Sequence, residues 1–155
     1  MPDVFTPEKR SEVMSRIRST GNKDTELRLM TLMKEAGIKG WRRHVALKER
    51  VRRAGDKTGG VRVRPDFVFR KERVVVFVDG CFWHGCPRCY RRPKQNRKFW
   101  DAKVLGNQAP DKKVSRVLKR DGWHVLRLWE CALTSKRAKA TVNRLSKALQ
   151  PENER

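Results

Sequence analysis

Residues 64–84, with the sequence RPDFVFRKERVVVFVDGCFWH, determine the fold class. Segments 66–69 and 74–78 are rich in aromatic and β-branched residues, which favour strands. The second segment is an unbroken apolar run, which is typical of a strand buried on both faces of a sheet. The short linker between the two predicted strands indicates a β-hairpin.

The hairpin is expected to bring two carboxylates together. A register that is symmetric about the peptide between Glu72 and Arg73 pairs Asp66 with Asp79, with Cβ atoms about 5 Å apart. Such carboxylates repel each other unless a proton or a divalent cation lies between them. Magnesium binds one or two carboxylates together with water and phosphate, so the pair suits phosphodiester hydrolysis. The alternative is structural: Asp79 belongs to a turn, and Asp66 follows a proline at a strand edge.

The rest of the chain adds helices around this hairpin. A helix that begins after Asp24 or Thr25 and ends at Gly37 has one apolar face. The other predicted elements are a short strand at 41–47, a mobile basic loop at 48–63, helices at 99–105 and 114–122, a strand at 124–129 and a closing helix at 136–149. This order predicts an α/β fold in which a mixed central sheet is flanked by helices. We expect a basic arm at 1–20, whose helix begins at Thr6, followed by one domain at 21–150 and a disordered tail at 151–155.

The charge of the chain points to nucleic acid. Its 155 residues include 39 lysines and arginines against 17 acidic residues, which gives a formal net charge of +22. A compact domain with this charge repels itself unless a polyanion lies alongside. A membrane is the competing partner, but no apolar run approaches the ~20 residues of a spanning helix. Residues 1–20 lack the apolar stretch of a secretory signal, so we expect a cytoplasmic, nucleoid-associated protein.

Four cysteines suggest a structural metal. Disulfides are rare in the cytosol, so these residues are free thiols or ligands. Three of them lie in a loop that contains glycine and proline, and the fourth lies far along the chain; they are Cys81, Cys86, Cys89 and Cys131. This pattern is typical of a closed tetrahedral zinc site that pins the loop to the last strand. Buried, reduced cysteines are the alternative.

The same loop carries a histidine and two aromatic residues. His84 is a near-neutral base of the kind that takes a proton from an attacking water, although alone it could equally be a zinc ligand or a packed side chain. The pairs Phe82–Trp83 and Phe99–Trp100 lie among cations that include Lys98. Aromatic residues interleaved with cations are typical of proteins that wedge into base steps. Core packing is the alternative, equally weighted for Phe99, whereas Trp83 and Trp100 favour DNA.

Several of these residues together resemble a known family. The runs 64–67 and 78–84, the later Trp129–Glu130–Cys131, and the helix that contains Glu26 are similar to the very short patch repair endonucleases. The resemblance spans about residues 6–149. It implies a fold similar to type II restriction endonucleases, a magnesium-dependent nick 5′ of the thymine in a T:G mismatch, and a structural zinc.

The resemblance also assigns roles to individual residues. Asp66 falls on the metal-binding aspartate, Val78 on a position whose carbonyl binds the metal, and His84 on the general base. Glu26 matches a glutamate that supports the site, and we expect it to hold His84 in place. The intercalating aromatics of the family fall on Phe82, Trp83 and Trp100, and Asn107 aligns with a polar residue close to the mismatch. Arg64 and Lys98 are predicted as further DNA contacts from their positive charge.

The chain departs from the family at three places. Asp79 stands where the family has a second catalytic histidine, which favours direct metal binding by Asp79. Cys86 and Cys89 replace a histidine and a cysteine, so an all-cysteine zinc site is itself a prediction. The loop at 48–63 is longer and more basic than expected, which leaves the sequence context of the cut open.

The predicted function is a monomeric mismatch endonuclease that acts on duplex DNA, with unknown repair partners. One alternative is a sequence-specific nicking or homing-type endonuclease on the same fold. Another is a zinc-stabilised DNA-binding protein without catalysis. The presence of Asp66, Asp79, His84 and Glu26 argues against the second alternative, because binding alone needs none of them.

Overall fold

A computed structural model describes residues 6, 8–9, 25–49 and 61–151. Its elements in chain order are α2 (Glu26–Glu35), β1 (Trp41–Arg43), β2 (Leu47–Glu49), β3 (Val61–Val63), β4 (Phe67–Phe69), β5 (Val74–Asp79), α3 (Arg97–Arg120), β6 (His124–Trp129), the 3-10 helix η1 (Glu130–Leu133) and α4 (Ala138–Ala148). Most of the predicted arm at 1–20 lies outside the described residues. Within it, the hydroxyl oxygen of Thr6 accepts a bond from the Lys9 N–H at 3.3 Å, as expected of a helix cap.

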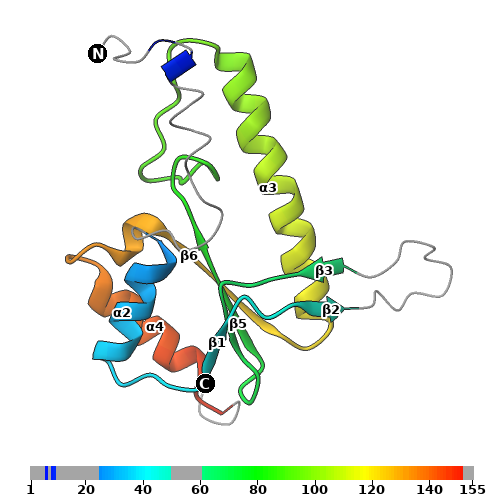
Figure 1. The fold of residues 1–155 in the computed structure, drawn as a ribbon, viewed down its shortest axis with the longest axis vertical. Helices are drawn as coiled ribbons and strands as arrows, with labels where there is room; N and C mark the ends of the chain where they lie inside the picture. The colour runs from blue at the N-terminus through cyan, green and yellow to red at the C-terminus, as the bar shows by residue number, and fades with distance from the viewer. Residues whose placement is uncertain (1–5, 7, 10–24, 50–60, 152–155) are drawn as a thin grey trace, which may run out of the picture.

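A mixed four-stranded sheet forms the centre, with strand order β1-β4-β5-β6 (Figure 1). β4 runs antiparallel to both of its neighbours, β1 and β5, whereas β6 runs parallel to β5. The mixed central sheet was predicted and is confirmed. None of the described helices is long and apolar enough to cross a bilayer.

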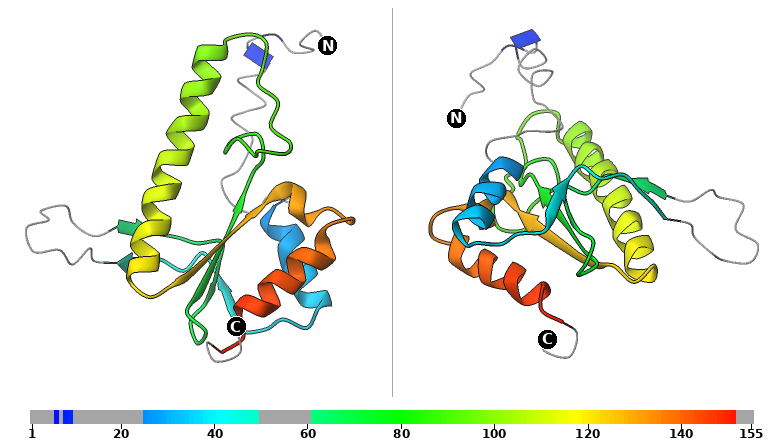
Figure 2. Two further views of the ribbon diagram at one scale, coloured as in Figure 1. Left: turned by 180° about the vertical axis from the view of Figure 1, so that it is seen from behind. Right: turned by 60° about the horizontal axis from the view of Figure 1, so that its bottom comes forward.

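Helices cover both faces of the sheet, with α2 and α4 on one side and α3 on the other (Figure 2). The alternation of side chains along the strands explains both layers. Phe67, Phe69, Val74 and Val76 pack with residues of α2 and α4, including Leu29 and Leu145. Val68 and Val75 face the other way and pack with Leu118 of α3 and Trp123. A buried β5 was therefore a correct prediction.

The hairpin register differs from the prediction. Phe67 pairs with Val76 and Phe69 with Val74, so the turn contains residues 70–73. The Arg73 N–H bonds the Arg70 carbonyl at 3.4 Å, and Arg73 adopts a positive φ of 53°. The centre of the hairpin therefore lies one residue earlier than predicted. Asp66 and Asp79 are not directly opposed, and their expected cross-strand pairing is wrong.

Two other predictions of local structure are corrected. The predicted helices at 99–105 and 114–122 are one 24-residue helix, α3, that passes through Pro110. The loss of one helical bond at a proline is tolerated because the helix is held at both ends, by buried Trp100 and by Leu118. The predicted strand at 41–47 is two short strands. The predicted loop at 48–63 begins and ends in a two-stranded sheet, β2 with β3, and residues 50–60 lie outside the described part.

Candidate active site

The candidate site lies where β5 ends and the loop 80–96 begins. The N-terminal half of α3 projects beyond the sheet, and this loop runs beside it (Figures 1 and 2). Two groups of three side chains each bring potential metal ligands within 4.8 Å of one another: Glu26, His44 and Asp66 form the first, and Asp79, His84 and Asp111 form the second. We call them the Asp66 group and the His84 group. The sequence predicted four of the six residues and missed His44 and Asp111.

The Asp66 group contains two carboxylates in a poorly solvated place. A carboxylate oxygen of Asp66 accepts the Val78 N–H at 2.8 Å, which ties the residue to the end of β5. Glu26 begins α2 and is 2% exposed, and its Oε2 lies 3.0 Å from Nε2 of His44. Burial, helped by the nearby charge of Glu26, raises the pKa of Asp66 to about 6, although the Val78 hydrogen bond lowers it. One buried and one partly buried carboxylate, together with an imidazole, are a donor set that fits a divalent cation.

The His84 group has the geometry of a base and the residue that orients it. Nδ1 of His84 lies 2.5 Å from a carboxylate oxygen of Asp111 in α3. This hydrogen bond raises the pKa of His84, against the opposing effect of burial. With Nδ1 donating to Asp111, Nε2 is left to accept a proton. The expectation that Glu26 holds His84 is therefore corrected: Asp111 does so, and Glu26 belongs to the other group.

Asp79 is paired with an arginine that the sequence reasoning missed. Nη1 of Arg127 in β6 lies 2.8 and 3.1 Å from the two carboxylate oxygens of Asp79 and 3.4 Å from Asp111. Burial raises the pKa of Asp79, and the charge of Arg127 opposes this. Direct metal binding by Asp79 was favoured from the sequence, but a guanidinium already neutralises this carboxylate. The sequence does mark Arg127, because it is a charged residue inside the otherwise apolar run VLRLW. It does not mark Asp111, because this residue lies in a polar helix.

α3 also holds the loop that carries His84. The Asn107 side-chain amide donates to the Trp83 carbonyl at 2.7 Å, and the Gln108 amide donates to the His84 carbonyl at 2.8 Å. Asn107 was predicted as a DNA contact, and here its amide fixes the backbone of the loop. Gly85 continues this contact: it has a φ of +65°, and a Cβ placed there would lie 2.8 Å from a methyl of Val104.

Replacing Gly85 by alanine should loosen this contact. The added Cβ meets both the positive φ and the close Val104, so we expect a loss of about 1–3 kcal/mol in the free energy of unfolding. We also expect slower DNA cleavage, since His84 is the preceding residue. Gly106→Ala in α3 is the matched control, because nothing lies within 4 Å of its Cβ, and it should add up to about 1 kcal/mol. Denaturant titration measures both, and equal stability of the two variants would contradict the close packing.

The aromatic residues form one cluster beside the loop. The ring of Phe82 lies 5.4 Å from Trp83 and 5.2 Å from Trp100, and Trp83 lies 6.3 Å from Trp100. Trp100 is 7% exposed, so it supports the other two rings, whereas Phe99 is 60% exposed. The sequence favoured DNA contact for Trp100 over Phe99, and the exposures are the reverse. Arg64 and Lys98 are both exposed.

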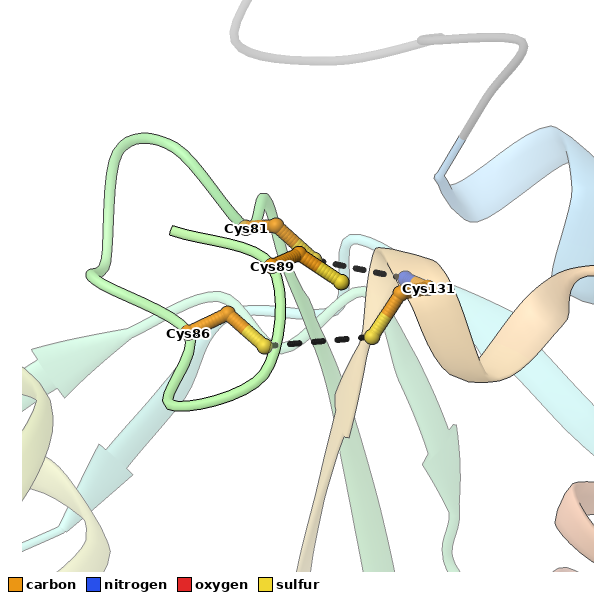
Figure 3. Close-up of side chains that lie close together, drawn as sticks. All are labelled: Cys81, Cys86, Cys89 and Cys131. Atoms are coloured by element: carbon orange, nitrogen blue, oxygen red, sulfur yellow. Dashed lines mark hydrogen bonds between the residues drawn. The ribbon is translucent and has the colours of Figure 1, made fainter. Parts of the chain in front are cut away.

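The four cysteines converge as the sequence predicted. Figure 3 shows the three loop cysteines pointing toward Cys131, which lies in η1 directly after β6. The sulfur atoms of Cys86 and Cys131 are 3.8 Å apart, and Cys81 accepts the Cys131 N–H through its sulfur at 3.4 Å. Thiolates bound to one tetrahedral zinc at about 2.3 Å lie roughly 3.8 Å from each other. The cluster therefore fits a metal, and all four are free thiols.

Comparisons with known proteins identify the family. The family model described as DNA mismatch endonuclease Vsr matches residues 2–91, more than half of the chain. The chain belongs to the Vsr family. This Vsr chain is therefore a DNA endonuclease, and its fold is restriction-endonuclease-like, as the resemblance implied.

Individual relatives agree with this assignment. The type II nicking enzyme V.NmeDIP of Neisseria meningitidis serogroup C is 39% identical over 129 residues, 82% of the Vsr chain and 77% of the relative. The type II nicking enzyme V.NaeI of Lentzea aerocolonigenes is 46% identical over 83 residues, which are 54% of the Vsr chain and 48% of that enzyme. The DNA mismatch endonuclease Vsr of Escherichia coli (strain K12) is 40% identical over 89 residues, 56% of each chain.

Proposed function

We propose that this chain nicks one strand of duplex DNA on the 5′ side of the thymine in a T:G mismatch. The observation that carries the proposal is the His84–Asp111 pair at the end of β5, close to the Asp66 group, in a chain of the Vsr family. A base beside a cation-binding carboxylate is what hydrolysis of a phosphodiester requires. A single site in one chain accounts for a cut in one strand, so the proposed enzyme acts as a monomer. Its proposed location is the cytoplasm, with the nucleoid.

Magnesium is the catalytic cation of this proposal. Asp66, the carbonyl of Val78 and Glu26 would hold it, because carboxylate and carbonyl oxygens are the donors that this ion prefers. When bound, the ion stabilises the negative charge that develops on the phosphate oxygens.

His84 is the general base. Asp111 fixes the imidazole through Nδ1, so that Nε2 takes the proton from the attacking water. Arg127 holds Asp111 and Asp79 together and is a positioning residue for His84. Its guanidinium also brings a positive charge to the place where the family has a second catalytic histidine. Asp79 then acts through Arg127, and direct contact with magnesium is no longer part of the mechanism.

The aromatic cluster selects a weakened base step. Phe82 and Trp83 enter the duplex beside the mismatch, and Trp100 supports them from below. A T:G wobble pair lowers the cost of unstacking, which is a few kcal/mol, so deformability becomes part of recognition. Arg64 and Lys98 are exposed and contact the phosphates, and Asn107 keeps the Trp83 backbone in place.

Zinc is the proposed structural metal of the four cysteines. Elemental analysis should find about one zinc per chain, and a strong chelator should unfold the protein, because zinc binding contributes directly to folding. Circular dichroism before and after chelation measures this. Cys89→Ser should release zinc, since Cys89 is a proposed ligand, whereas Ser115→Ala should retain it. A fully folded, metal-free protein would exclude the zinc site.

Sequence-specific nicking is the second candidate function, and it is favoured by the names of two relatives, which are type II nicking enzymes. The two functions are separated by duplexes of identical sequence that contain either T:G or C:G at one position. With magnesium present, strand-specific cleavage of the T:G duplex alone supports the mismatch proposal. Equal cleavage of both duplexes refutes mismatch recognition and supports the alternative.

A further inference from the structure

His44 has a backbone conformation that needs an explanation. It lies between β1 and β2 and has a φ of 50°, in the left-handed region that residues with a side chain rarely adopt. Outliers of this kind persist only where the surroundings hold them, and they cluster at functional sites. Here the conformation turns the chain at the end of β1 and brings the imidazole to Glu26.

The imidazole completes a set of three ligands from three separate elements. Glu26 begins α2, His44 lies after β1, and Asp66 directly precedes β4. One donor atom from each residue lies within 4.8 Å of the other two. The Glu26 side chain is 3% exposed and that of His44 is 28% exposed, so the group opens toward solvent on the histidine side.

The distance between two of the ligand atoms suits a single divalent ion. Ligands at about 2.0–2.1 Å from an octahedral ion are roughly 3 Å apart when adjacent and about 4 Å apart when opposite. Nε2 of His44 and Oε2 of Glu26 are 3.0 Å apart, which matches an adjacent pair. A terminal nitrogen of Arg43 lies 3.4 Å from both atoms, so a bound ion would have to displace this guanidinium from them.

We propose that His44 is a nitrogen ligand of the catalytic cation, together with Asp66 and Glu26. This inference rests on the proposed function, because it concerns the cation of the same site. It has a consequence for metal preference. Imidazole suits transition metals, whereas magnesium prefers oxygen ligands, so His44 should favour Mn²⁺ over Mg²⁺.

The test measures Mn²⁺ binding to the zinc-loaded, DNA-free protein by the loss of the free Mn²⁺ signal in electron paramagnetic resonance. His44→Ala should weaken Mn²⁺ binding by about 10- to 100-fold, the range seen when supporting residues of metal sites are removed. Competition with Mg²⁺ should show that Mg²⁺ affinity falls less. His124→Ala is the matched control. His124 begins β6, whereas the candidate site lies near the other end of this strand, where Trp129 pairs with Asp79, so Mn²⁺ affinity should be unchanged.

A second measurement does not depend on the folding of a variant. In the wild-type protein, pulsed electron paramagnetic resonance should detect a directly bound ¹⁴N on the Mn²⁺. Unchanged or tighter Mn²⁺ binding by folded His44→Ala would overturn the proposal, because a histidine that only pairs with Glu26 competes with the metal. Absence of ¹⁴N coupling in Mn²⁺-loaded wild type would overturn it as well. Nicking of a T:G duplex by the same wild-type preparation tests the proposed function separately.

Discussion

Asp66→Asn should bind a T:G duplex as tightly as the wild type and should lose nicking by about 10³-fold or more. The asparagine oxygen can still accept the Val78 N–H, so β5 and its loop should keep their positions. The negative charge that holds the cation is lost, and charge stabilisation by a metal contributes several kcal/mol to such reactions. Single-turnover cleavage in magnesium and a binding titration in calcium measure the two effects.

The matched control for this variant is Asp101→Asn. Asp101 is an aspartate of α3 that pairs with Arg92 at the surface, away from both groups of the site. We expect this change to leave the cleavage rate within about twofold, since exposed ion pairs contribute little. Full turnover by Asp66→Asn would contradict the metal-binding role of Asp66.

His84→Ala should slow the chemical step by about 10²- to 10⁴-fold, which is the usual contribution of a general base. Mn²⁺ affinity should be retained, because His84 belongs to the group around Asp79 and Asp111 and not to the Asp66 group. Asp111→Ala should cause a smaller loss, since it leaves the imidazole in place but without its orienting partner. Single-turnover rates at saturating enzyme isolate this step.

Arg127→Leu distinguishes positioning from proton transfer. It removes the contact to Asp79 and Asp111 without touching the imidazole. A rate between those of Asp111→Ala and the wild type is expected, with partial recovery in Arg127→Lys.

The outcome that would contradict the role of His84 is nicking of T:G duplexes by His84→Ala at the wild-type rate, because His84 is then not the base.

The sequence predicted the parts of the fold that local patterns specify. β5 is an unbroken apolar run and lies inside the sheet between β4 and β6. β6 was predicted with its observed bounds, 124–129, because its apolar residues alternate, as expected of an edge strand in which every second side chain is buried. The hairpin register was wrong because it depends on the four-residue turn at 70–73, which apolar patterning does not determine. Likewise, α3 continues through Pro110 because packing at both of its ends outweighs the local break.

The candidate site divides in the same way. Asp66, His84 and the three loop cysteines stand in short motifs, so the sequence marked them as candidate site residues. His44, Asp111 and Arg127 reach the site from three separate elements, and only the folded chain brings them together. Trp100 shows the opposite limit: the aromatic pattern marked the cluster correctly, but the sequence did not reveal which ring is buried.

A crystal structure of the wild-type protein with an uncleaved T:G duplex and calcium would test the central claim most directly. The scissile phosphate on the 5′ side of the thymine should lie between the two groups, with a cation on Asp66 and with Nε2 of His84 within hydrogen-bond reach of the attacking water. A duplex whose nearest phosphate lies outside the reach of both Asp66 and His84 would contradict the account.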